Sequence, residues 1–317
     1  MHQSKSNTCV AAVFLETGRP LQLRSFELPL PSEGEALVRV TLCTLCGSDL
    51  HTLTGARIEP TPSILGHEII GEVCEVGDPP PSDVEGQPVR KGDRVTWSVC
   101  VSCFDCERCR SGMPQKCLNV TKYGHSVAEG RNALSGGLAE KILLRKGSSI
   151  AKLGPDLPDH VACPINCATS TIAAAFRAAG DVTDRRVVII GSGMLGLTAT
   201  AYAKFLGAAE VSVCDVDSDR LGLADRFGAD RSIQTAADHS ITALASSFDV
   251  VIECSGAADA VESTVLLGDI GARIVLVGSV MESRPVSFDP ARIVRGWLSI
   301  AGVHNYAPED IAVSYTH

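Results

Sequence analysis

The stretch RVVIIGSGMLGLTATAYAKFLG, residues 186–207, decides the fold of the second half of the chain. It opens with an apolar run typical of a buried strand and continues, after a glycine turn at 191–193, as a helix over 194–205. Gly191, Gly193 and Gly196 match the pattern G-x-G-x-x-G. Such glycines permit a tight turn, close approach of the backbone to a pyrophosphate, and close packing of helix on strand. The stretch therefore predicts a dinucleotide-binding turn, with phosphates at the helix N-terminus.

An acidic residue follows at the distance that this kind of turn requires. Asp215 ends the next predicted strand, residues 209–215. An aspartate at that point accepts hydrogen bonds from the ribose hydroxyls of the cofactor, and its charge repels a 2′-phosphate. The sequence thus favours NAD over NADP. The alternative, a glycine turn that precedes an acidic strand end by coincidence, is disfavoured by the strand–turn–helix context.

Strands and helices continue to alternate toward the C-terminus. Further strands are predicted at 230–233, 247–253, 272–278 and 297–303, with helices at 218–227 and 258–267. Such alternation implies right-handed crossovers and a parallel sheet. Six strands complete a doubly wound α/β fold, and we expect this nucleotide-binding domain to span residues 156–303.

The first 155 residues have a different texture. Short apolar runs at 36–40, 69–76 and 94–99 are separated by glycine and proline clusters, such as DPPPSDVEGQP at 78–88. Runs of this length bounded by turn residues predict strands. We therefore expect an irregular β-rich domain over residues 1–155.

Five of the thirteen cysteines lie close together in that domain, at Cys100, Cys103, Cys106, Cys109 and Cys117. Zinc takes four thiolates in a tetrahedron, and gaps of two residues let one loop surround the ion. We expect Cys103, Cys106, Cys109 and Cys117 to hold a structural zinc. A set in which Cys100 replaces Cys117 stays open on spacing alone, and a metal-free thiol cluster is the weaker alternative.

Composition excludes several classes of function. The 317 residues carry 28 Lys and Arg against 37 Asp and Glu, a net charge of −9, which disfavours binding to nucleic acid by charge. The longest uncharged stretch, residues 187–203, is interrupted by glycines and is not expected to span a membrane. The first sixteen residues lack the features of a signal peptide, so a cytoplasmic location is expected.

Three residues far apart in the sequence are candidates for a second, open metal site. Cys46 lies in LCGSDLH, His67 in LGHEIIGEV and Cys167 in NCATST. A catalytic zinc takes three protein ligands and keeps one exchangeable position. Each residue also has a structural interpretation, as a turn histidine or a small buried apolar side chain. The residues alone leave this choice open.

The motifs taken together resemble the zinc-dependent medium-chain alcohol dehydrogenase family. They are CGSD at 46–49, GHE at 66–68 followed by Gly71, the four-cysteine lobe and the later G-x-G-x-x-G. The resemblance runs from about Leu21 to Val303. It implies a Rossmann domain joined to a GroES-like catalytic domain, two zinc ions per chain, and NAD as cofactor.

The resemblance also assigns roles within the site. It implies that Cys46, His67 and Cys167 bind the catalytic zinc. Ser48 matches the hydroxyl that bonds the substrate oxygen, and His51 matches the outer member of a proton relay.

Further positions carry over in the same way. Asp49 and Glu68 match carboxylates that support the zinc ligands, and Thr171 and Arg220 match residues that contact the cofactor.

Family members return to the catalytic domain after the sixth Rossmann strand. This chain stops at His317, so residues 304–317 are expected to form a shortened return and the C-terminal part of the catalytic domain to be truncated. The segment around Trp297 to Ile300 resembles the region through which family dimers join their sheets. A homodimer or homotetramer is therefore expected.

The implied function is reversible hydride transfer between an alcohol and NAD, with an aldehyde or ketone as product. Motifs including YGH at 123–125 and GVHNY resemble a subgroup associated with phosphonate catabolism, which implies a phosphonate-bearing alcohol with His125 and His304 as pocket candidates. A polyol- or threonine-type dehydrogenase is one alternative, favoured by Gly47 and disfavoured by Cys167. A non-catalytic NAD-binding relative is the other, which the shortened end favours and the intact ligand set disfavours.

Overall fold

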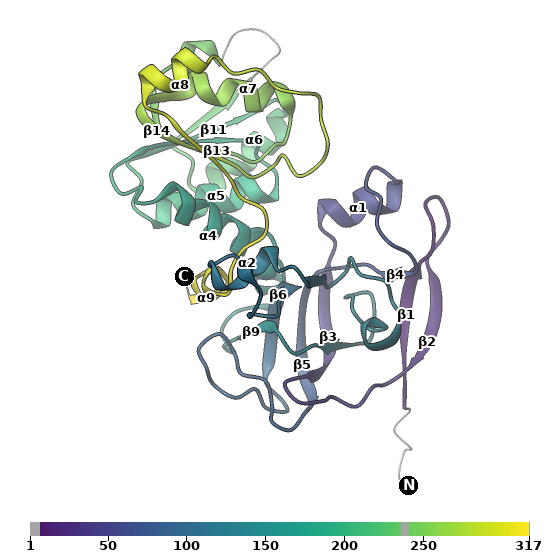
Figure 1. Ribbon diagram of the computed structural model, residues 1–317. Coiled ribbons are helices and arrows are strands. Elements are labelled where there is room, and N and C mark those ends of the chain that lie inside the picture. The colour runs from purple at the N-terminus through teal and green to yellow at the C-terminus, as the bar shows by residue number, and fades with distance from the viewer. Residues whose placement is uncertain (1–6, 236–240, 317) are drawn as a thin grey trace. The chain divides into compact units, whose positions relative to one another are not determined.

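The computed structural model describes residues 7–235 and 241–316, so the first six residues of the N-terminal stretch considered above lie outside it. The chain divides into two compact units (Figure 1). The first comprises Met1–Cys167 and Ala307–His317, and the second Ala168–Tyr306. No helix among the described residues is both long and apolar enough to cross a membrane.

The second unit is built on a parallel sheet of six strands. The strands are β10 (Arg186–Ile190), β11 (Glu210–Asp215), β12 (Arg231–Gln234), β13 (Phe248–Glu253), β14 (Gly268–Leu276) and β15 (Ser299–Gly302). Their order across the sheet is β12-β11-β10-β13-β14-β15, and every neighbouring pair is parallel. Numbered within the unit, this order is 3-2-1-4-5-6, that of the Rossmann fold. The prediction of a doubly wound sheet is confirmed.

Helices cover both faces of this sheet (Figure 1). They are α4 (Ala168–Ala179), α5 (Met194–Phe205) and α6 (Ser218–Ala224) on one face, and α7 (Ala258–Leu267) and α8 (Pro290–Gly296) on the other. Val187 and Ile189 of β10 pack into the first core, whereas Val188 and Ile190 pack into the second. Because both faces are buried, the strand is apolar at successive positions rather than at alternate ones.

The first unit is β-rich, as predicted, and its paired strands are antiparallel. One sheet joins β2 (Gln22–Glu27), β1 (Thr8–Phe14) and β4 (Ser63–Ile64). The other runs β7-β6-β5-β3-β8, with bounds Thr121–Lys122, Arg94–Val101, Glu68–Val76, Ala36–Thr44 and Lys141–Leu144, and β9 (Ser148–Lys152) pairs with β6. Val38, Ile69 and Trp97 are fully buried in the core of this larger sheet.

Short helices connect these strands. They are α1 (Gly47–Thr54), α2 (Glu107–Arg110) and the 3-10 helices η1 (Pro114–Lys116) and η2 (Gly130–Asn132); the second unit adds η4 (Asp225–Phe227) and η5 (Thr242–Leu244).

The first unit extends to Cys167, beyond the boundary expected after residue 155. Helices α3 (Asp159–Ala162) and η3 (Cys163–Asn166) follow β9, and η3 packs against β3, β5 and β6. This packing places the segment with the β-rich unit. At the other end of the chain, α9 (Pro308–Thr316) contacts η3, β6 and β9, so the polypeptide re-enters the first unit at Ala307.

Candidate functional site

Three side chains predicted as metal ligands come together within the first unit. The Sγ of Cys167 lies 3.8 Å from the Sγ of Cys46 and 3.4 Å from the Nε2 of His67. All three ligand atoms lie within 4.8 Å of one another. Tetrahedral zinc, with bonds of about 2.0–2.3 Å, separates its ligand atoms by about 3.5–3.8 Å. The set of two sulfurs and one imidazole therefore fits a zinc ion that keeps a fourth position for an exchangeable ligand.

Each of these ligands stands at the end of a secondary-structure element. Cys46 is the N-cap of α1, His67 directly precedes β5, and Cys167 is the C-cap of η3. Gly66 adopts a φ of +86°, and a Cβ there would come within 2.6 Å of the Sγ of Cys43. Only glycine fits this turn without strain, and the turn is what brings the chain to His67.

One buried carboxylate links the first two ligand segments. Asp49 has no exposed surface, and its Oδ2 accepts a hydrogen bond of 3.0 Å from the backbone N–H of Cys46. Its Oδ1 accepts from the N–H of Gly66 at 3.0 Å and lies 3.2 Å from Nδ1 of His67. Burial raises the pKa of Asp49, but the hydrogen bonds from His67 and the two amides outweigh it and hold the pKa below its usual value. The carboxylate thus fixes the imidazole orientation that leaves Nε2 toward the sulfurs.

Asn166 ties the third ligand segment to the His67 segment and to β6. Its Nδ2 donates to the carbonyl oxygens of His67 (2.8 Å) and Trp97 (2.9 Å), and its Oδ1 accepts from the N–H of Ile69 (3.3 Å). The side chain is completely buried. Asn166 was not among the residues predicted from the sequence, where its position directly before Cys167 is the one signal of its role.

The ligand side chains favour a Cys46 thiolate paired with a protonated His67, whose proton a metal ion would displace. A hydrogen bond from Cys167 lowers the pKa of Cys46 to about 3, with burial opposing the shift and His67 adding to it. Burial lowers the pKa of His67, but hydrogen bonds to Asp49 and Cys46 override it and raise the pKa to about 10. Cys46 is therefore a thiolate, the form of cysteine that binds metal.

The remaining predicted residues of this site lie around the ligands. Glu68 is buried, and its Oε2 accepts a hydrogen bond of 2.6 Å from the hydroxyl of Thr44. Burial raises the pKa of Glu68. Ser48 and His51 both lie on α1, three residues apart and hence on one side of the helix. Ser48, two residues after the ligand Cys46, is half-buried, whereas His51 is exposed to solvent.

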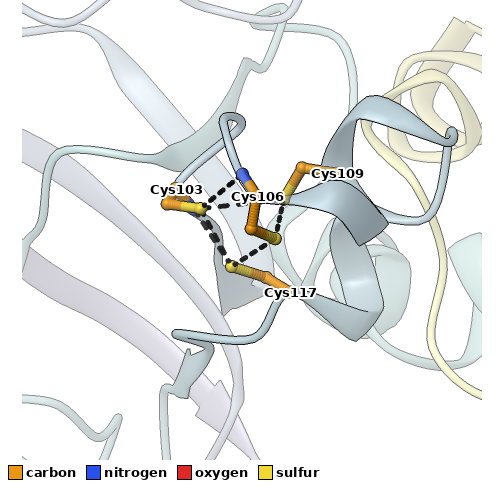
Figure 2. A group of neighbouring side chains, drawn as sticks. All are labelled: Cys103, Cys106, Cys109 and Cys117. Carbon is orange, nitrogen blue, oxygen red and sulfur yellow. Dashed lines mark hydrogen bonds between the residues drawn. The ribbon is translucent and has the colours of Figure 1, made fainter.

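The four lobe cysteines also converge, and their side chains point toward one another (Figure 2). The Sγ–Sγ distances are 3.4 Å for Cys103–Cys117, 3.5 Å for Cys106–Cys109, 3.9 Å for Cys106–Cys117 and 4.0 Å for Cys103–Cys109. These values bracket the edge of about 3.8 Å expected for a tetrahedral zinc tetrathiolate. Cys100 is not in this group; it is buried on β6.

Backbone amides stabilise the charged sulfurs of the lobe. The N–H of Cys106 donates to the Sγ of Cys103 at 3.3 Å, and the N–H groups of Cys103 and Asn119 donate to the Sγ of Cys117, also at 3.3 Å. Hydrogen bonds from the amides of Asp105 and Cys106 lower the pKa of Cys103 to about 6. The donor set and its second layer of N–H groups fit a closed, structural zinc.

The glycine turn has the geometry that a dinucleotide requires. Gly191 adopts a φ of +96°, and a Cβ on Gly196 would lie 1.7 Å from the carbonyl oxygen of Gly191. Gly193 faces open space instead, so a ligand can approach its backbone. The carboxylate of Asp215 accepts hydrogen bonds from the N–H (2.6 Å) and hydroxyl (2.8 Å) of Ser192. Asp215 is therefore placed beside the turn, at the carboxyl end of β11.

Two further predicted cofactor contacts lie on helices of the same unit. Thr171 is half-buried on α4. Arg220 is exposed on α6, where its guanidinium lies 3.6 Å from the carboxylate of Asp217. Of the two histidines considered as pocket candidates, His125 is buried against His67 in the first unit, and His304 belongs to the second unit.

Comparisons with known proteins agree with this geometry. Residues 32–155 match the alcohol dehydrogenase GroES-like domain, and residues 195–315 match the zinc-binding dehydrogenase domain. A probable alcohol dehydrogenase of Mycobacterium tuberculosis is 31% identical over 309 residues, which cover 92% of this chain and 82% of the relative. An L-threonine 3-dehydrogenase of Anaeromyxobacter dehalogenans is 31% identical over 292 residues, or 88% of this chain and 79% of the relative.

Solved structures show the same architecture. An alcohol dehydrogenase from Thermotoga maritima superposes with a TM-score of 0.90 at 26% identity, covering 98% of this chain and 88% of its own. A putative zinc-binding dehydrogenase from Sinorhizobium meliloti, solved with NADP, superposes with a TM-score of 0.84 at 25% identity over 98% and 89% of the two chains. The chain therefore belongs to the zinc-dependent medium-chain alcohol dehydrogenase family, oxidoreductases that act on the CH–OH group.

Proposed function

We propose that this chain is a zinc- and NAD-dependent alcohol dehydrogenase in which Cys46, His67 and Cys167 hold the catalytic zinc. The observation that carries the proposal is the convergence of two sulfurs and one imidazole at tetrahedral spacing, with no fourth protein ligand grouped with them among residues 7–235 and 241–316. The four lobe cysteines would hold a second zinc in a closed, structural site.

The residues of the site divide the chemical work. When bound, zinc supplies a Lewis acid for the substrate oxygen and the nicotinamide supplies the hydride acceptor. Ser48 would take up the proton of the substrate hydroxyl while passing its own hydroxyl proton on toward His51, whose exposed imidazole releases a proton to solvent. Asp49 holds His67 in the orientation that binds metal, and Glu68 adds a buried negative charge beside the ligands.

The preference for NAD rests on Asp215. Hydrogen bonds from Ser192 and neighbouring amides outweigh the effect of burial and hold the pKa of Asp215 below its usual value, so the carboxylate is charged at neutral pH. A charged carboxylate beside the turn suits a ribose with two free hydroxyls and disfavours a 2′-phosphate. Thr171 and Arg220 are proposed as further cofactor contacts. The Sinorhizobium relative was solved with NADP. The preference of this chain for NAD over NADP therefore has to be measured on this chain and cannot be taken from its relatives.

The candidate substrate classes come from the family and from the relatives that the chain resembles. Alcohols are the general proposal, and the threonine dehydrogenases among the relatives favour an alcohol with a polar neighbour as the second candidate. The phosphonate-bearing alcohol expected from sequence motifs stays a prediction.

We also propose a cytoplasmic homodimer or homotetramer. Support for assembly comes from β15, an edge strand of the parallel sheet, next to which Trp297 is 82% exposed.

The test of the proposal is a Cys46→Ala variant. NADH formation from a panel of alcohols, threonine and hydroxyalkylphosphonates is expected to be abolished, because the open zinc site loses a ligand, while NADH binding measured by fluorescence is retained. Cys74→Ala is the matched control, since Cys74 is a half-buried cysteine of the same unit that lies outside both clusters, and it is expected to keep wild-type activity. Near-full activity in Cys46→Ala would contradict the proposal.

A further inference from the structure

A buried polar cluster beside His67 is not used by the scheme above. The imidazole of His125 is 8% exposed, and its ring centroid lies 4.7 Å from that of His67, with the rings tilted by 41°. Nδ1 of His125 lies 3.4 Å from Oε1 of Glu59. The same oxygen is paired with the guanidinium of Arg57 at 2.5 Å. Glu59 and Arg57 come from the segment that follows α1, whereas His125 comes from the loop after β7.

This cluster is incompletely satisfied. Arg57 holds the carboxylate oxygen tightly, and the longer contact leaves Nδ1 of His125 without a well-formed hydrogen bond within residues 7–235 and 241–316. Buried polar atoms of this kind are uncommon in native proteins, and each calls for an explanation. A histidine kept only to fill space beside His67 would gain nothing from two nitrogens and an ion pair behind it. A ligand that hydrogen-bonds the His125 ring, with Glu59 and Arg57 orienting the ring from behind, explains why all three residues are present.

The position of the ring relative to the metal site supports a role in substrate binding. A zinc ion on Nε2 of His67 would lie about 3.2 Å from the centroid of that ring, given a bond of about 2.0–2.1 Å. Since the two centroids are 4.7 Å apart, the ring of His125 lies within about 8 Å of the metal, wherever the ion sits around Nε2. A substituent one or two carbons from a zinc-bound oxygen spans such a distance.

We propose that His125, oriented by Glu59 and Arg57, is a specificity-determining residue that hydrogen-bonds a second hydroxyl group of the substrate, one or two carbons from the reacting alcohol. This inference rests on the proposed function, because it assumes that the substrate oxygen is bound at the Cys46–His67–Cys167 site. Glu59 faces Nδ1 and so leaves Nε2, the other polar atom of the ring, to the substrate. A hydroxyl can donate to that nitrogen or accept from it, so the pairing does not depend on the protonation of His125.

The charges nearby favour a neutral substituent over an anion. Asp49, Glu59 and Glu68 place three carboxylates around the two histidines. Of the cations near this cluster in the described part of the chain, Arg57 is already bound to Glu59, and Lys122 acts on the same carboxylate. An anionic group that reached His125 would face Glu59. The expected class is therefore a diol or polyol rather than a phosphonate-bearing alcohol.

The test uses the full-length, zinc-loaded protein with propan-1-ol, propane-1,2-diol and a hydroxyalkylphosphonate as substrates. His125→Phe keeps a ring against His67 and removes both nitrogens. We expect kcat/KM for the diol to fall by about two- to tenfold and that for propan-1-ol to stay essentially unchanged, because one hydrogen bond to a neutral group is lost. His125→Gln, which keeps hydrogen-bonding atoms, is expected to recover part of the diol activity. His160→Gln, a change of an exposed histidine of the same unit, is the matched control.

Binding to the cobalt-substituted protein separates this inference from the proposed function. Cobalt bound to cysteine thiolates absorbs visible light, and a ligand at an open site changes the spectrum. The diol is expected to change it at a lower concentration in the wild type than in His125→Phe, and propan-1-ol to act equally on both. A His125-dependent response to the diol without turnover of any alcohol would refute the proposed function and keep the inference.

Three results would overturn the inference. The first is an equal loss of diol and propan-1-ol activity in His125→Phe with two zinc ions per chain retained, which would make His125 a packing residue. The second is an unchanged spectrum and unchanged kinetics for the diol in both His125 variants. The third is a preference for the hydroxyalkylphosphonate that is lost in His125→Phe.

Discussion

Replacing Asp49 with asparagine tests how the ligand segments are held together. The carboxylate accepts three hydrogen bonds, one from the N–H of Cys46 on Oδ2 and two, from Gly66 and His67, around Oδ1. An asparagine side chain presents one oxygen and one NH2 group, so in either orientation an N–H donor meets another donor. The less damaging orientation keeps the oxygen toward Gly66 and His67 and loses the bond to Cys46.

The size of the effect follows from that single bond. A hydrogen bond to a charged group contributes about 1.5–3 kcal/mol. At about 1.4 kcal/mol for each factor of ten, Asp49→Asn should weaken zinc binding at the Cys46–His67–Cys167 site by about 10- to 100-fold. Loss of a partner behind a metal-binding histidine has effects of about the same size.

The assay is chelator competition, in which zinc per chain is measured after dialysis against graded concentrations of chelator. The lobe zinc serves as an internal reference and should resist removal equally in both proteins. Asp156→Asn, a change of an exposed aspartate in the same unit, should behave as the wild type. If Asp49→Asn retains the zinc of the Cys46–His67–Cys167 site as firmly as the wild type, the carboxylate does not position the ligands and the reasoning fails.

Three further predictions concern the second unit. Gly196→Ala forces a Cβ within 1.7 Å of the carbonyl oxygen of Gly191, so the turn must shift; NADH fluorescence titration should show about tenfold or greater loss of affinity. Asp215→Ala should raise kcat/KM with NADP relative to NAD, and an unchanged ratio would show that another residue reads the ribose. The hydrogen bond from Arg284 lowers the pKa of Glu262 to about 2, below its value in the unfolded chain, so this stabilisation is present above about pH 4.5 and is lost as pH falls toward 2. In urea unfolding, Glu262→Gln should therefore lose less stability than the wild type over that range.

Matched variants accompany these changes. Gly222→Ala adds a Cβ with no heavy atom within 4 Å on a helix of the same unit, and it should leave cofactor affinity unchanged. Glu282→Gln removes an exposed carboxylate close in sequence to Arg284 and should keep the wild-type dependence of stability on pH. A Glu262→Gln curve that coincides with the wild type would show that the ion pair does not contribute to stability.

Local patterns in the sequence predicted the second unit closely. The strand at 186–190 and the helices at 194–205 and 258–267 have the bounds that the structure shows. Buried parallel strands are uniformly apolar and the helices between them have a period of 3.6, so both patterns lie within a short window. The strand predicted at 272–278 begins earlier, at Gly268, and its register with β13 shifts between Gly268 and Arg273.

Helix α8 was missed although its start carries a local signal. Asp289 is its N-cap, with the side chain accepting from the N–H of Ala291, and Pro290 occupies its first position. Acidic N-caps followed by proline are typical helix starts.

The two sets of metal ligands also differ in how much a short stretch of sequence reveals about them. Close spacing predicted a zinc lobe, because five cysteines fall within one short segment, but spacing alone left open whether Cys117 or Cys100 completes the set. Cys46 and Cys167 are separated by 121 positions, and no short-range pattern relates them, so family resemblance had to supply the set. The contacts of Asn166 with His67 and of Glu59 with His125 depend on how the strands fold back on each other, which a single sequence does not reveal.

The most direct test of the central claim is the number of zinc ions per chain, counted by native mass spectrometry in the wild type and in Cys46→Ala. The account predicts two ions in the wild type and one in the variant, with the lobe site still filled. Two ions retained in Cys46→Ala, or a single ion in the wild type, would contradict it.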